Sequence, residues 1–346
     1  AGAYVPLERP ASVIVLKELH GTPRELQRNG SASLLDLGDG VLGLEFHSKA
    51  NALDNDLVAM GYAALEALDR PEWAGLVVGN QGEHFSLGAN LMLVGLAAQA
   101  GQFGQVEALV RQFQDLALLM RYSAKPVVTA PFGRTLGGGA ETALAGARIV
   151  AAAETYLGLV EFGVGLIPAG GGCKEVVRRL VAPHVAEGAN LLPHLQRAFE
   201  TIGFAKVSES AHQARELGFL TAGDRIVLNP AELIGEAKRE VLQLVQAGYA
   251  PPARERVVYA LGQRGQAALT AGIHTLRWGN YISDHDKLIA LKLAHVLSGG
   301  DLSAPAWVPE PYFLDLEREA FLSLLGEPLT QARIAHMLQT GKPLRN

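Results

Sequence analysis

The feature that most constrains the fold is a pair of glycine triplets, Gly137–Gly139 and Gly170–Gly172. Each follows short apolar runs and precedes a helical pattern, in a chain where 39 of 346 residues are glycine. Glycine adopts backbone conformations that other residues avoid and lets two segments approach closely. Three consecutive glycines before a helix can leave backbone N–H groups directed at a ligand, with the helix dipole behind them. The triplets therefore predict tight turns into helices, at which negative charge is stabilised.

Short strands alternate with helices between residues 33 and 180. Residues 33–37 and 41–46 flank Gly38-Asp39-Gly40, which predicts a hairpin. Buried strands are predicted at 76–78, 126–128, 149–153 and 156–160, and helices over 55–69 and 105–121. This order predicts an α/β layer with a partly parallel sheet.

After Pro183 the pattern is helical, and we predict no strand there. Asn229–Glu232 has the residues of a capping box, Ser283 and Asp286 begin another helix, and a helical pair is predicted over 313–325 and 329–340. We therefore divide the chain into a linker over 1–30 with one strand at Ser12–Leu16, an α/β core over 31–185, and a helical C-terminal region over 186–346.

Composition excludes several classes of partner and site. A net charge of −5 gives no basic face for nucleic acid. The most apolar stretch, 148–173, is interrupted by charged residues, so we predict no membrane helix. The single cysteine, Cys173, cannot form an intramolecular disulfide, and the ten histidines show no metal-ligand spacing. We expect a cytoplasmic protein without a metal site.

The first glycine triplet does not match the common phosphate-binding motifs. A Walker loop needs Gly-Lys-Ser/Thr where this chain has Ala140-Glu141-Thr142, and the glycines do not fit G-x-G-x-x-G. The G-x-S-x-G elbow of serine hydrolases is also absent. What remains is a donor-rich turn and two acids, Glu141 and Glu161, 20 positions apart in apolar sequence. Two carboxylates beside an oxyanion site suit proton transfer next to a carbonyl.

The residues alone leave simpler interpretations open. Glu141 also fits a first-turn acid that compensates the helix dipole, Glu161 fits an ordinary charge at a strand end, and Gly170–Gly172 fits a plain tight turn. Asp284-His285-Asp286 is better explained as a solvated helix start than as a metal cluster, and Cys173 as a small buried thiol.

Taken together, these segments resemble the crotonase (enoyl-CoA hydratase) superfamily. The resemblance rests on the order and spacing, over roughly 33–180, of Ser86–Asn90, Lys125–Gly133, Leu136–Glu141, and Glu161 with the run Gly165–Gly172. It implies a crotonase-like ββα spiral core followed by an extended helical C-terminal region. The later segments 205–220, 248–252, 281–287 and 314–346 resemble the C-terminal half of bacterial bifunctional 3-hydroxyacyl-CoA dehydrogenases.

The resemblance also implies a role for each matching residue. The backbone amides of Ala89 and Gly138 would form an oxyanion hole for a thioester carbonyl. Glu141 would activate water, and Glu161 would exchange a proton with C2 of the acyl chain. Met92 and Leu93 would face that chain. Coenzyme A would be held, mostly through backbone groups, by Lys49, Ala50, Ala52, Ser86, Leu87, Gly88, Asn90 and Leu91.

Because both acids are present, the resemblance favours enoyl-CoA hydratase activity in fatty-acid β-oxidation. Two alternatives stay open: an enoyl-CoA isomerase that uses Glu161 alone, and a non-catalytic acyl-CoA-binding module. Ala140 and Val160 depart from the family's usual cysteine and proline, which affects the shape of the pocket.

The resemblance further implies a context for the chain. It has no cofactor of its own beyond the coenzyme A of its substrate. An NAD-binding dehydrogenase portion is expected to precede residues 1–30, with Ala1 as a truncation point. We expect a homo-oligomer, and the extra C-terminal helices either cover the pocket or dock the dehydrogenase portion.

Overall fold

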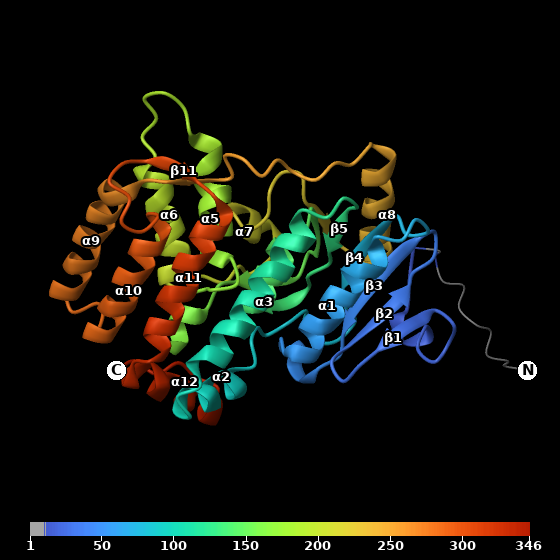
Figure 1. Ribbon diagram of the computed structural model, residues 1–346, viewed down its shortest axis with the longest axis horizontal. Helices are drawn as coiled ribbons and strands as arrows, with labels where there is room; N and C mark the ends of the chain where they lie inside the picture. Colours follow the sequence, from blue (N-terminus) through green and yellow to red (C-terminus); the bar gives the residue numbers. More distant parts are fainter. Residues whose placement is uncertain (1–9, 11) are drawn as a thin grey trace, which may run out of the picture.

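The computed structural model (Figure 1) describes residue 10 and residues 12–346, which form three sheets. The main sheet has the strand order β1-β2-β3-β4-β5-β7-β9, in which β1, β2 and β3 are antiparallel and β3 to β9 run parallel. Two small sheets pair β6 with β8 and β10 with β11. The strands are β1 Glu25–Arg28, β2 Ala32–Asp36, β3 Val41–Phe46, β4 Gly75–Gly79, β5 Val127–Thr129, β6 Gly133–Leu136, β7 Arg148–Ala152, β8 Thr155–Gly158, β9 Arg225–Val227, β10 Val258–Ala260 and β11 Ala306–Val308.

Helices cover both faces of the main sheet and form the C-terminal region. The α-helices are α1 Asn55–Leu68, α2 Leu91–Gln99, α3 Phe103–Arg121, α4 Gly138–Leu144, α5 Gly172–Leu180, α6 Leu192–Gly203, α7 Ala211–Glu216, α8 Leu233–Gln246, α9 Gly262–Trp278, α10 Asp284–Leu297, α11 Glu310–Leu325 and α12 Pro328–Thr340. Short 3-10 helices lie at Leu16–Glu18, Lys49–Asn51, Glu161–Val164, Ala182–His184 and Pro230–Glu232. Among the described residues no helix is both long enough and apolar enough to cross a bilayer.

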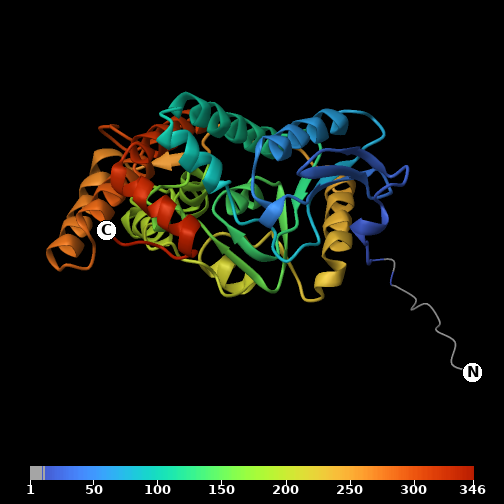
Figure 2. The same cartoon turned by 90° about the horizontal axis from the view of Figure 1, so that it is seen from below.

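The predicted hairpin and the predicted α/β layer are confirmed. β2 and β3 pair through a turn at Gly38–Gly40 in which all three residues have positive φ. Strands β3, β4 and β5 are buried on both faces, as parallel strands usually are. Leu42 and Leu44 of β3 pack in the core shared with α1 and α3, while Val41 and Val77 pack with α8. Figure 2 shows α1 and α8 on opposite sides of this sheet.

The structure corrects the predicted segment boundaries. Residues 1–9 and 11 of the predicted linker lie outside the described residues, but β1 belongs to the main sheet. The strand predicted at Ser12–Leu16 is wrong: its backbone is held by the side chain of Gln81, which accepts from the Leu16 amide (2.8 Å) and donates to the Ile14 carbonyl (2.7 Å). The α/β core also extends past residue 185, because β9 is its last strand and α8 covers one face.

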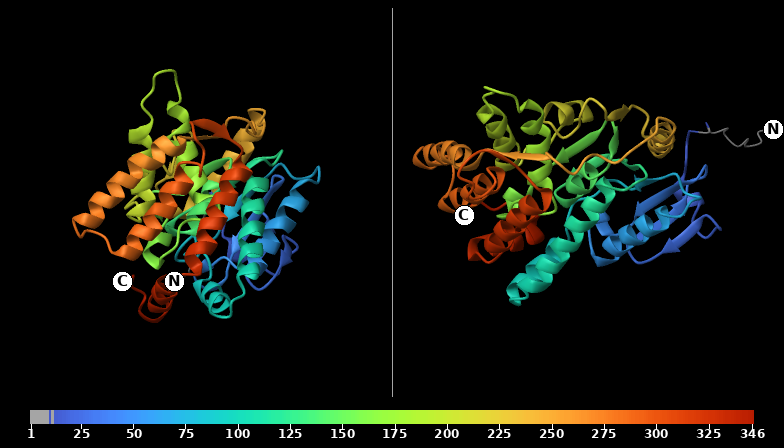
Figure 3. Two further views of the ribbon diagram at one scale, coloured as in Figure 1. Left: turned by 60° about the vertical axis from the view of Figure 1, so that its left-hand side comes forward. Right: turned by 45° about the horizontal axis from the view of Figure 1, so that its top comes forward.

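The C-terminal helices form a group at one end of the molecule (Figure 3). Helix α10 begins after Ser283 as predicted, and the side chains of Ser283 and Asp286 form a capping box there. The three side chains of Asp284-His285-Asp286 diverge to different partners, Arg277, Thr330 and Arg333. Three-residue strands β9, β10 and β11 were not predicted, because so few residues show no alternation. Helix α11 packs against α3 and α5, which brings the C-terminal region next to the second glycine triplet.

Candidate active site

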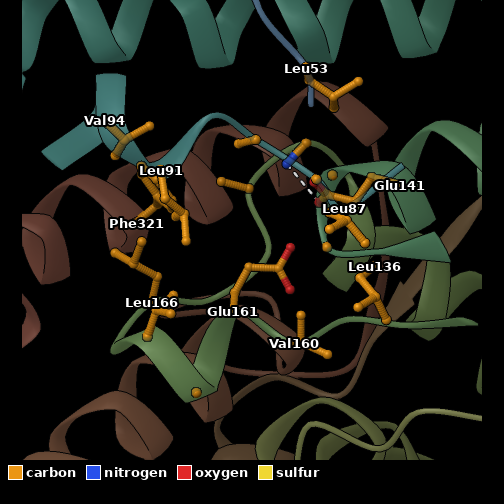
Figure 4. Close-up of a pocket in the computed structure, with 18 of the residues that line it drawn as sticks. Leu53, Leu87, Leu91, Val94, Leu136, Glu141, Val160, Glu161, Leu166 and Phe321 are labelled. Atoms are coloured by element: carbon orange, nitrogen blue, oxygen red, sulfur yellow. Dashed lines mark hydrogen bonds between the residues drawn. The ribbon is translucent and has the colours of Figure 1, made fainter. Parts of the chain in front are cut away.

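A cavity of about 610 Å³ lies between the α/β core and the C-terminal helices (Figure 4). Both Glu141 and Glu161 line it, and nearly all of its other walls are apolar. A mostly apolar cavity of this size with a few convergent polar groups is typical of a small-molecule site. The apolar walls come from α2 (Leu91, Val94), α3 (Val106, Leu109, Val110, Phe113), the segment after Glu161 (Val164, Leu166) and the C-terminal region (Phe321, Met337).

Glu141 lies in the first turn of α4, which begins directly after Gly137. Its side chain is buried, and its Oε1 accepts hydrogen bonds from the amides of Gly170 (2.7 Å) and Gly172 (2.8 Å). Burial raises the pKa of Glu141 to about 7, while the amides of Gly172 and Gly170 and the charge of Lys174 oppose the shift. The two glycine triplets thus meet at this carboxyl group: the first starts its helix and the second holds its oxygen.

The second triplet contains glycine because no side chain fits there. A Cβ on Gly170 would lie 2.2 Å from Cε1 of Phe113 and 2.7 Å from Oε2 of Glu141. A Cβ on Gly172 would lie 2.9 Å from Oε1 of the same carboxyl group. Only glycine allows the backbone to approach the acid closely enough for both hydrogen bonds.

Glu161 begins the 3-10 helix Glu161–Val164, and Figure 4 shows its carboxyl group directed into the cavity. Its Oε2 is buried and has no hydrogen-bond partner within the described part of the chain. Burial raises the pKa of Glu161 well above its usual value, and the nearby Glu141 carboxylate raises it further. Because the Glu141 carboxylate opposes ionisation of Glu161, the pair favours one ionised and one protonated carboxyl group, a base and an acid facing one cavity.

The amides of Ala89 and Gly138 also lie side by side at this cavity. Gly138 is the first residue of α4, where a backbone N–H has no acceptor inside its own helix. An atom at the Cβ position of Gly138 would lie 3.4 Å from the nitrogen of Ala89. Over the described residues neither amide makes a hydrogen bond. Two unpaired donors beside two acids can bind an oxygen atom on which negative charge develops.

The residues predicted to hold coenzyme A are only partly brought together. Leu87, Gly88 and Leu91 line the cavity, whereas Lys49, Ala50, Ala52, Ser86 and Asn90 do not. Lys49 and Ala50 are exposed on the 3-10 helix Lys49–Asn51, and the carbonyl of Ala50 accepts from the Leu87 amide (3.3 Å).

Two of the residues predicted to contact coenzyme A make hydrogen bonds inside the protein. Ser86 is fully buried, its Oγ accepts from the Gly88 amide (3.1 Å), and its backbone pairs with residues of β6, so its polar groups are used inside the protein. Asn90 is the N-cap of α2, where its side chain accepts from the Leu93 amide. Both residues shape the loop that presents Ala89.

The prediction that Met92 and Leu93 face the acyl chain is wrong. Their side chains are 58% and 48% exposed, and the cavity is lined by Leu91 and Val94 of the same helix. Helix α2 is apolar on nearly all sides, so its sequence does not indicate which face is directed inward. Sequence reasoning also missed the walls from α3 and from Phe321 and Met337, for which helical apolar spacing was the available signal.

Comparison with known proteins finds similarity to one family model and to several longer curated proteins. A sequence model described as enoyl-CoA hydratase/isomerase matches residues 37–203. The whole chain is 46% identical to a Bacillus subtilis (strain 168) protein named "Probable 3-hydroxyacyl-CoA dehydrogenase" and spans 43% of it. A segment of 153 residues, 44% of the chain, is 35% identical to 21% of a Rickettsia felis protein named "Putative fatty acid oxidation complex trifunctional enzyme". The chain therefore spans less than half the length of these curated relatives.

Solved structures share the fold. The enoyl-CoA hydratase of Bacillus halodurans superposes with a TM-score of 0.61 at 17% identity, covering 88% of this chain and 99% of that one. The putative enoyl-CoA hydratase of Streptomyces avermitilis gives a TM-score of 0.58 at 18% identity, covering 91% and 93%. At such low identity the similarity establishes the fold alone and assigns no role to any residue of the cavity.

Proposed function

We propose that this chain is an enoyl-CoA hydratase of the crotonase superfamily, which adds water reversibly and syn to a trans-2-enoyl-CoA. The observation that carries the proposal is the meeting of Glu141 and Glu161 in one apolar cavity beside the amides of Ala89 and Gly138. The unbonded Oε2 of Glu161 supports a role in chemistry, because a buried polar atom without a partner destabilises a fold.

In the proposed reaction the amides of Ala89 and Gly138 bind the thioester oxygen and stabilise the charge that develops on it. Water lies between the two acids. Glu141, as carboxylate, takes a proton from water while the oxygen bonds to C3, and Glu161, as carboxylic acid, gives its proton to C2. The product is a 3-hydroxyacyl-CoA. One proton has then moved from Glu161 to Glu141, and its return between the carboxyl groups restores the starting state.

The longer Bacillus subtilis relative supports a second proposal, about the reaction that follows hydration. The chain aligns over its full length with less than half of a protein whose name describes a 3-hydroxyacyl-CoA dehydrogenase. We propose that a dehydrogenase portion with bound NAD oxidises the 3-hydroxyacyl-CoA that this chain produces, within fatty-acid β-oxidation. That portion, homo-oligomer assembly and a cytoplasmic location remain predictions.

The direct test is hydration of crotonyl-CoA by the purified chain, followed as loss of enoyl-thioester absorbance. We expect turnover and a 3-hydroxyacyl product. Acyl-CoA binding without turnover would instead identify a binding module. Conversion of a 3-enoyl-CoA that survives Glu141→Ala would identify an isomerase that uses Glu161 alone.

The pH dependence of hydration is expected to have an acidic limb near pH 7. Glu141 must be ionised to accept a proton, and burial raises its pKa to about 7. Activity should therefore rise with pH through that value, and fall by about tenfold per unit below it. It should decline again only at higher pH, where Glu161 loses its proton. Measuring kcat/KM for crotonyl-CoA across neutral pH tests this, and a profile that stays flat from about pH 5 to pH 8 would contradict it.

A further inference from the structure

The backbone amides that begin α5 are divided between two buried carboxyl groups. Those of Gly170 and Gly172 donate to Oε1 of Glu141, at 2.7 and 2.8 Å. Those of Gly171 and Lys174 donate to Glu317, at 2.8 Å to Oε2 and 2.6 Å to Oε1. The glycine loop is therefore held from both sides, by the acid of the cavity and by a second acid.

Glu317 comes from a distant part of the chain and does not line the cavity. It lies on α11, 146 positions from Gly171, and its side chain has no exposed surface. It therefore cannot touch a substrate in the cavity. Any influence on the reaction has to pass through the loop that it binds.

The same loop is linked to α11 by a second set of buried hydrogen bonds, which pass through Gln114. Nε2 of Gln114, on α3, donates to the carbonyl of Ala169 (2.6 Å) and to the carbonyl of Leu314 (2.9 Å). Arg318 donates to Oε1 of Gln114 (2.6 Å) and so orients its amide. Two adjacent residues of α11 thus act on the segment 169–174, one directly and one through Gln114.

The surroundings of Glu317 disfavour the ionised form of its carboxyl group. Burial raises its pKa well above the usual value and the Glu141 carboxylate raises it further, while the amides of Lys174 and Gly171 lower it. A buried carboxyl group is tolerated where such donors satisfy both oxygens. At Gly171, φ is +112°, a conformation that residues with a side chain rarely adopt, so the turn requires glycine at this position.

We propose that Glu317 is a positioning residue for the hydration reaction: by binding the amides of Gly171 and Lys174 it directs the amides of Gly170 and Gly172 at Glu141 and sets the orientation of that carboxylate. The inference rests on the proposed hydratase function. It also gives the C-terminal helices a part in the reaction, since α11 completes the support of an acid that belongs to the α/β core.

The test is a double-mutant cycle between Glu317 and Glu141. In Glu317→Gln the side-chain NH₂ faces a backbone N–H, so one amide of the loop loses its acceptor. A catalytic group displaced by about 1 Å can lose on the order of 100-fold in rate, so we expect kcat to fall roughly 10- to 100-fold. KM for crotonyl-CoA should change little. In the Glu141→Gln background, Glu317→Gln should reduce kcat no further, because its effect passes through Glu141.

Control variants separate positioning from stability. Glu319→Gln changes an exposed acid of the same helix and should leave kcat unchanged. Glu317→Asp keeps the carboxyl group but withdraws its oxygens, so it should lower kcat in the same direction and provides the measurement if Glu317→Gln does not fold. If Glu317 had a purely structural role, its substitution would lower the melting temperature and raise KM without a selective loss of kcat. That result, or a multiplicative loss in the double variant, would overturn the proposal.

A measurement independent of turnover distinguishes failure of this inference from failure of the hydratase assignment. Hydrogen exchange of the peptide that covers residues 165–175 should accelerate in Glu317→Gln and stay unchanged in Glu319→Gln. If wild-type protein does not hydrate crotonyl-CoA, the proposed function fails. If exchange in this peptide is unaffected, Glu317 does not hold the loop, whatever the activity.

Discussion

Replacing Glu161 by glutamine is expected to lower kcat for crotonyl-CoA hydration by at least about a hundredfold, since a positioned general acid contributes ~10²–10⁴ in rate. The carboxyl group faces the cavity, and its buried Oε2 has no partner among the described residues. A carboxamide has the same shape but no proton that it can give to C2 at neutral pH. The change therefore removes proton transfer and leaves the cavity walls in place.

Folding should be nearly unaffected by this change. The Oε2 atom of Glu161 makes no hydrogen bond that glutamine would lose, and burial disfavours the charged form of the carboxyl group. The melting temperature and the affinity for a saturated acyl-CoA should stay close to those of wild type. Glu154→Gln, at an exposed position in the preceding turn, is the matched control. A wild-type rate in Glu161→Gln would end the assignment of this residue as the acid.

The parts of the fold that could be predicted from sequence are those with a local signal. The Gly38–Gly40 turn requires three positive φ angles between two apolar runs, and a hairpin follows from that alone. Helix α10 begins at a capping box that four residues specify. Strand β9 has three residues and becomes a strand only because it pairs with β7, a contact between segments that the sequence does not connect.

The candidate site, too, could be predicted from sequence only in part. The two glycine triplets and the two acids stand out in the sequence, but their meeting in one cavity depends on how α4 and α5 pack, and was expected only through the family resemblance. Burial of Ser86, exposure of Met92 and Leu93, and the binding of Gly171 by Glu317 all depend on segments distant in the chain. A residue's type indicates the chemistry it can perform, and tertiary packing decides whether it can reach a ligand.

Glutamine at position 141 is expected to abolish most hydration without destabilising the protein. Loss of the general base should lower kcat by about a hundredfold or more. The remaining carbonyl oxygen can still accept from the amides of Gly170 and Gly172, so the loop keeps its hydrogen bonds. Steady-state rates with crotonyl-CoA test the loss of activity, and thermal unfolding tests the unchanged stability. Both are measured near pH 8.

The direction of the stability effect follows from the pKa of Glu141. Folding raises it from 4.5 to about 7, so the native state disfavours the ionised form, and stability declines as pH rises between these values. Near pH 8 the neutral carboxamide of the Glu141→Gln variant avoids that penalty, and the variant should be at least as stable as wild type. A variant that is inactive because it unfolds would contradict this account, and so would one that hydrates crotonyl-CoA at the wild-type rate. A stable, folded protein with little turnover is the outcome that makes Glu141 a catalytic base rather than a structural acid.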